Sequence, residues 1–114
     1  MKARFTTVEF PVFSDFIVHV EIARNFEKAV KKYPSIADLS QKEDEEADAL
    51  TVYDGGQICF IFLKSNVSVG TIAHEAFHAV EHMMKRFDVK LKGETPAYHL
   101  GYLVNQIFRF VRNK

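Results

Sequence analysis

The chain has 114 residues, of which 47% are hydrophobic and 26% charged, and its 15 Lys and Arg balance 15 Asp and Glu. This composition excludes a wholly disordered chain, and the length predicts one domain spanning residues 1–114. No apolar run is long enough to cross a membrane and the N-terminus lacks a signal-peptide core, so we expect a cytoplasmic protein without membrane partners.

The charge is unevenly spread along the chain. Residues 1–57 carry 7 Lys or Arg against 11 Asp or Glu, whereas residues 58–114 carry 8 against 4. Such a difference can orient a partner, but solvated faces of a small domain are the favoured explanation. The basic residues are scattered among apolar ones and no nucleic-acid motif accompanies them. Nothing but the charge favours nucleic-acid binding, so we do not expect it.

Two strands and a helix are predicted in the first third of the chain. Arg4 to Phe10 alternates in polarity and is rich in Thr, Val and Phe, and Phe16 to Glu21 alternates likewise. His19 falls within the second strand, which favours a strand residue over a metal ligand. Apolar residues between 22 and 33 then recur at helical spacing, with an alternative start as early as Ser14.

The middle of the chain is polar and then changes to a hairpin pattern. Residues 35–48 include the acidic run 43–46, which predicts an exposed loop, with a cation site or a docking tail as the alternative. Residues 49–53 and 57–63 flank Asp54-Gly55-Gly56, a hairpin signal because glycine accepts the positive φ of tight turns. The single cysteine, Cys59, has apolar neighbours, which predicts a buried structural thiol.

The sequence His74-Glu75-Ala76-Phe77-His78 lies within a predicted helix over residues 69–87. Apolar residues recur there at 3-4-3-4 spacing, and Ser68 is a suitable cap. Residues four apart share a helix face, so His74 and His78 can present two imidazoles to one metal ion while Glu75 lies beside it as a general base. The motif is short and can occur by chance, but its helical context favours a metal site.

A catalytic zinc usually has three protein ligands and an open position. Glu94 is the candidate for the third ligand. Fifteen residues separate it from His78, which is enough for the helix to end, the chain to turn near Gly93 and another helix to begin. We expect that helix over residues 96–111, with Thr95 as a plausible cap. Tyr98, four residues after Glu94, can point into the same cleft.

These residues resemble the zincin metallopeptidases. The window from Thr71 to Val80 is similar to the extended zincin signature, and Glu94 with Ala97 and Tyr98 resembles the third-ligand segment of the gluzincins, particularly small metallopeptidase-like proteins of phage and prophage. The resemblance covers residues 49–112. It implies Zn²⁺ held by His74, His78 and Glu94, with Glu75 as catalytic base and Tyr98 assisting.

The predicted fold is α+β, a minimal zincin-like domain in which a small, mostly antiparallel sheet packs on an N-terminal helix, the motif helix and a C-terminal helix. The resemblance further implies that a strand beside the cleft, here residues 57–63, offers its backbone to an extended peptide or protein substrate. The expected activity is zinc-dependent peptide-bond hydrolysis. The alternative is a non-catalytic, metal-containing module that binds a protein partner, such as a host factor if the gene is phage-borne.

Two further histidines are weaker candidates. His82 continues the four-residue spacing, but three ligands along one straight helix span roughly 12 Å, too far to surround one ion. We therefore expect His82 to lie behind the ligands or face solvent. His99 lies on the wrong side of its predicted helix relative to Glu94, so it ranks below Tyr98.

Overall fold

The computed structural model describes residues 4–39 and 47–113. It confirms the predicted α+β class, with four strands and three helices in these ranges. The elements are β1 (Phe5–Glu9), β2 (Ile17–Ile22), α1 (Phe26–Lys31), β3 (Ala49–Tyr53), β4 (Ile58–Leu63), α2 (Val69–Arg86) and α3 (Glu94–Arg112). The acidic run at residues 43–46 lies outside the described residues.

The four strands form one mixed sheet in the order β1-β2-β4-β3. The outer pairs β1–β2 and β3–β4 are antiparallel, and the central pair β2–β4 is parallel. The prediction that residues 57–63 offer a free edge is therefore wrong, because β4 has a hydrogen-bonded neighbour on each side. The edges of the sheet are β1 and β3, and β3 is the one that packs beside α2.

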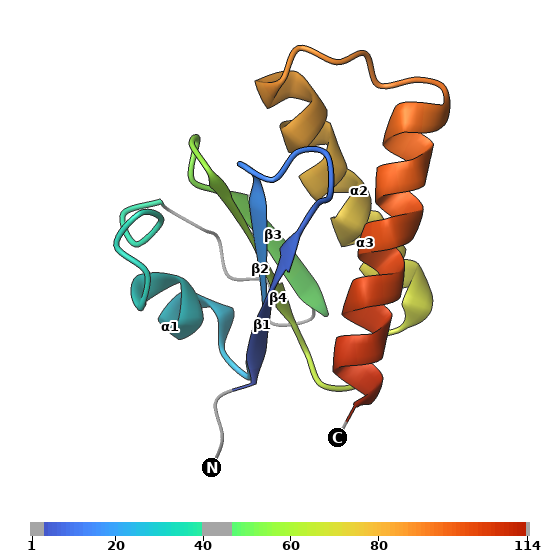
Figure 1. Ribbon diagram of the computed structural model, residues 1–114. Coiled ribbons are helices and arrows are strands. Elements are labelled where there is room, and N and C mark those ends of the chain that lie inside the picture. The colour runs from blue at the N-terminus through green and yellow to red at the C-terminus, as the bar shows by residue number, and fades with distance from the viewer. Residues whose placement is uncertain (1–3, 40–46, 114) are drawn as a thin grey trace.

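The helices cover both faces of the sheet (Figure 1), with α1 on one face and α2 and α3 on the other. Because side chains alternate along a strand, each face contributes its own apolar residues. The larger core joins the sheet to α2 and α3 and includes Val18, Cys59, Ile61, Val80 and Leu103. The smaller core joins it to α1 and includes Phe26, Val30, Val52, Phe60 and Phe62.

The first helix is shorter than its apolar spacing predicts. Strand β2 continues through Ile22, which pairs with Leu63, so this residue belongs to the sheet. Helix α1 begins only after Asn25, whose side chain accepts a hydrogen bond from the Lys28 amide at 2.9 Å. A good N-cap and a strand pairing therefore outweigh the helical pattern at the start of this segment.

The two long helices follow the prediction closely. Ser68 caps α2 by accepting a hydrogen bond from the Thr71 amide at 3.1 Å. The suggestion that Thr95 caps α3 is wrong: the cap is Gly93, whose φ of +84° suits glycine, and the helix already begins at Glu94. In the described ranges, no helix has the length and apolar character needed to cross a membrane.

Candidate metal centre

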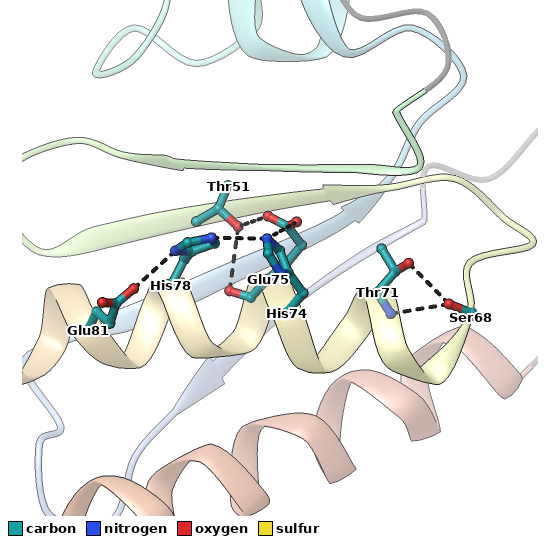
Figure 2. A network of polar contacts seen from close by, with 7 residues as sticks. All are labelled: Thr51, Ser68, Thr71, His74, Glu75, His78 and Glu81. Atoms are coloured by element: carbon teal, nitrogen blue, oxygen red, sulfur yellow. Dashed lines mark hydrogen bonds and ion pairs between the residues drawn. The ribbon is translucent and has the colours of Figure 1, made fainter. Parts of the chain in front are cut away.

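Helix α2 buries one side against the core and turns the motif away from it. Its buried residues include Ile72, Ala76, Val80 and Met83. On the other side, the His74 side chain is 68% exposed and that of Glu75 only 12% exposed. Figure 2 shows both histidines and Glu75 of the motif projecting from α2 on the side of β3.

The two motif histidines converge on one point. Their Nε2 atoms lie 3.2 Å apart, and the two rings are nearly perpendicular at 82°. Two nitrogens bound to one tetrahedral zinc at about 2.05 Å are separated by roughly 3.3 Å. The observed separation of the Nε2 atoms in His74 and His78 therefore matches the spacing of two ligands on one metal ion.

A carboxylate holds the second histidine from behind. The Nδ1 atom of His78 lies 3.0 Å from Oε1 of Glu81 (Figure 2). When His78 Nδ1–H donates to this oxygen, Nε2 is left with its lone pair directed toward His74. Ligand histidines commonly donate to a carboxylate in this way, which fixes the ring and raises its basicity. Sequence analysis missed Glu81, although its i, i+3 spacing from His78 was a usable signal.

The motif glutamate is held by the neighbouring strand. Oε1 of Glu75 accepts a hydrogen bond from Oγ1 of Thr51 in β3 at 2.5 Å. Its other oxygen, Oε2, lies 4.0 Å from Nε2 of His74. One carboxylate oxygen of Glu75 is thus anchored, while the other faces the point where the histidine nitrogens converge. No sequence pattern points to Thr51, which lies 24 residues before Glu75 in the chain.

The two candidates from α3 lie elsewhere on the surface. Glu94 is exposed at the first residue of the helix, and Tyr98 is 59% exposed. Across residues 4–39 and 47–113, no three His, Cys, Asp or Glu side chains are assembled as a metal site. The structure thus brings together His74, Glu75 and His78 of the predicted set, and the roles of Glu94 as third ligand and Tyr98 as assistant stay predictions.

His82 and His99 take up packing positions. The ring of His82 stacks on Tyr53 with centroids 4.7 Å apart, and burial lowers its pKa from the ordinary value. His99 is only 3% exposed and its Nδ1 lies 2.7 Å from the Thr95 carbonyl oxygen, while its Nε2 has no partner. Neither histidine has a ring nitrogen bonded to the converging pair.

His19 is a buried strand residue, as predicted. It lies in β2 with Nε2 3.0 Å from Oε1 of Glu21. Lys32 and Tyr33 also donate to the Glu21 carboxylate. Burial opposes ionisation of this carboxyl, but the three hydrogen bonds together hold the pKa of Glu21 below its ordinary value.

An apolar hollow of about 230 Å³ lies between α2 and the start of α3. Phe77, which separates the motif residues Glu75 and His78 in the chain, forms part of its wall and is 40% exposed. The other lining residues are Val80, Leu91, Gly93, Pro96, Ala97 and Leu100. The hollow thus adjoins the motif on the side where α2 meets α3.

The donor set on α2 suits zinc, which accepts imidazole nitrogen and carboxylate oxygen. Two imidazoles with converging Nε2 atoms and an anchored carboxylate beside them match the arrangement expected of the first two ligands and a base. Comparison of the chain with protein-family models, curated proteins and solved structures finds no match.

Proposed function

We propose that this protein is a zinc-dependent peptidase of gluzincin type, in which His74 and His78 bind the metal and Glu75 is the general base. One observation carries the proposal. The Nε2 atoms of the two histidines are 3.2 Å apart, and a free carboxylate oxygen of Glu75 lies 4.0 Å from one of them. A structural metal site has no need of an anchored carboxylate that is not itself a ligand.

The roles of the chain's own groups follow from their positions. His74 and His78 would hold the zinc ion, which when bound would supply Lewis acidity to polarise a peptide carbonyl and to lower the pKa of water toward neutrality. Glu75 takes the proton of the attacking water on Oε2 and delivers it to the leaving amine. Thr51 keeps Oε1 engaged, so that Oε2 is the atom presented to the reacting groups.

The surroundings of the motif offer a place for an extended peptide. The free edge of β3 lies beside Glu75, and strand addition to it would align a backbone past the histidines. We therefore propose a peptide or protein substrate that lies along β3.

Glu94 remains our candidate for the third ligand. The first turn of α3 meets α2 at Phe77, since Phe77 and Gly93 line the same hollow. Phe77 faces α3 whereas His78 projects on the side of β3, so Glu94 would have to approach the histidines when zinc binds. Tyr98, one turn further along α3 and 59% exposed, would be available to donate a hydrogen bond to a developing oxyanion.

The decisive experiment combines metal content with cleavage. Zinc is measured by elemental mass spectrometry on untagged protein for the wild type, His78→Ala, Glu94→Ala and Glu75→Gln, and all four are incubated with a mixed peptide library. We expect about one zinc per chain in the wild type and in Glu75→Gln, little in the other two, and cleavage by the wild type alone.

A surface variant provides the control. Glu27→Gln alters an exposed carboxylate on α1, on the opposite face of the sheet, and should match the wild type in both zinc content and cleavage. Full cleavage by Glu75→Gln would refute the base assignment. A protein that binds no zinc, and gains no thermal stability when zinc is added, would refute the metal centre.

The second candidate is a non-catalytic, metal-containing module that binds a protein partner. The observation in its favour is the openness of the site, since the side chains of His74 and His78 are 68% and 44% exposed. In that case a partner would supply the remaining ligand, and zinc affinity would rise when the partner is added. A cytoplasmic location, with a single buried thiol at Cys59, is part of both candidates.

A further inference from the structure

Strand β1 has free backbone groups along its outer side. The amide of Ile22 donates to the carbonyl of Arg4 at 2.9 Å. Because hydrogen-bonded and non-hydrogen-bonded pairs alternate in an antiparallel ladder, every second residue of β1, counted from Arg4, bonds to β2. The residues between them, Phe5, Thr7 and Glu9, therefore direct their N–H and C=O groups away from the sheet. Of these groups, the carbonyl of Glu9 accepts a hydrogen bond from the hydroxyl of Tyr102 at 3.3 Å.

A hollow of about 240 Å³ lies between this edge and the C-terminal half of α3. Its walls include Thr6, Thr7 and Val8 of β1 and Gln106, Arg109 and Phe110 of α3. Arg4 closes one end, because its guanidinium donates to the carbonyl oxygens of Phe110 and Asn113. The free edge is thus the floor of a groove rather than an isolated strand.

The groove is positively charged. Arg109 lines it with an exposed side chain, and within the described ranges no carboxylate forms an ion pair with this guanidinium. Arg112 follows three residues later, where its guanidinium lies 5.0 Å from the centre of the Phe108 ring. A carboxylate in the groove could therefore accept charge-assisted hydrogen bonds from the guanidinium of Arg109.

Of the features that usually prevent strand addition, the β1 edge has only its short length and one charged residue, Glu9. Strand β1 has the sequence Phe-Thr-Thr-Val-Glu, with neither proline nor lysine, and its first residue, Phe5, is 53% exposed. Natural sheets commonly protect exposed edges with proline, charged residues or bulges, because unpaired edges attract other strands. An edge left open beside a polar groove favours a dedicated partner.

We propose that the β1 edge binds an extended segment of a partner protein as an added strand, with an Asp or Glu of that segment paired to Arg109. Side chains of an added strand alternate between the two faces of the sheet. The carboxylate therefore belongs at a position whose side chain faces α3, as Thr6 and Val8 do. This surface is at the opposite edge of the sheet from Glu75, and the inference does not depend on the proposed peptidase.

The test uses two blocked hexapeptides of alternating threonine and valine, one with a central glutamate and one with lysine in its place. Binding is followed by nuclear magnetic resonance of the backbone amides. We expect shifts and exchange protection at Phe5 and Thr7. We also expect the glutamate peptide to bind about fivefold more tightly, the range of an exposed ion pair.

Matched variants separate the two components of binding. Arg109→Ala should abolish the preference for glutamate, whereas Arg112→Ala, an exposed arginine outside the groove, should keep it. Thr7→Pro removes an outward N–H, which an edge strand tolerates, and should abolish binding of both peptides, whereas Thr7→Val should not. If Thr7→Pro fails to fold, Arg109→Ala against Arg112→Ala still decides the charge pairing.

Three results would overturn the proposal. One is equal binding of the two peptides by the wild type. Another is binding of neither peptide at millimolar concentration. The third is wild-type self-association that Thr7→Pro abolishes while no peptide binds, which would identify the edge as an interface between two copies of this chain.

Discussion

The contact between His78 and Glu81 gives a quantitative prediction that needs no substrate. Glu81→Ala removes the carboxylate that lies 3.0 Å from Nδ1 of His78. Loss of a carboxylate behind a ligand histidine typically weakens metal binding 10- to 100-fold. Because both side chains are about two-fifths exposed, at 44% and 40%, solvent weakens the contact, and we expect the low end of this range.

The expected change is thus about tenfold in the dissociation constant for zinc, or about 1.4 kcal/mol. Glu81→Gln keeps an oxygen that accepts from Nδ1–H but loses the charge, so its effect should be smaller, about threefold. The measurement is competition with a fluorescent zinc chelator at pH 8. Metal binding releases protons from the ligands, so a pH above neutrality favours zinc in this competition.

The control is Glu27→Ala, which removes an exposed carboxylate, at 53%, from an ion pair with Lys31 on α1. Its zinc affinity should equal that of the wild type. If Glu81→Ala binds zinc as tightly as the wild type while His78→Ala does not bind it, the carboxylate has no part in orienting the ligand. If neither variant changes the affinity, the convergence of the two histidines does not mark the zinc site.

Three further predictions concern stability and reactivity. Burial raises the pKa of the Cys59 thiol to about 12, so iodoacetamide at pH 8 should modify it only as fast as the protein unfolds, and fast labelling of folded protein would show that the thiol is exposed. The pKa of Glu21 is lower in the folded chain than its ordinary 4.5. Its contribution to stability is therefore present above pH 4.5 and is lost as the pH falls through the folded value. Glu21→Gln should unfold at a lower urea concentration at pH 7, and its free energy of unfolding should decline less steeply in acid. His99→Phe removes a buried nitrogen without a partner and should change the melting temperature little, whereas His99→Ala leaves a cavity and should lower the free energy of unfolding by about 2–3 kcal/mol.

The parts of the fold that sequence predicted well are those set by local interactions. Helix α2 follows from apolar residues at helical spacing and from Ser68 as its cap. The β3–β4 hairpin follows from the turn at residues 54–56, where Gly55 has φ of +82°. The convergence of His74 and His78 also follows from helix geometry alone, because residues four apart share a face.

The parts that sequence could not predict depend on pairings distant in the chain. The unbroken apolar run of β4 was a usable signal that this strand is buried on both faces, but its parallel contact with β2, which puts it inside the sheet, has no local signal. The anchoring of Glu75 by Thr51 likewise exists only because β3 packs beside α2. Glu81 is a different case, since its spacing from His78 was visible and only its role was overlooked.

The parallel seam at the centre of the sheet bears on how the chain folds. Each antiparallel pair joins strands that are neighbours along the chain, so β1–β2 and β3–β4 can form by closing short loops. In the seam, Ile17 of β2 lies against Ile58 of β4, and the whole of α1 must be accommodated between them. Contacts between residues far apart in the chain carry a larger loop-closure entropy than those of the two hairpins and slow folding more. Joining the two hairpins therefore completes the sheet face that packs on α2, and the two apolar cores form in the same step.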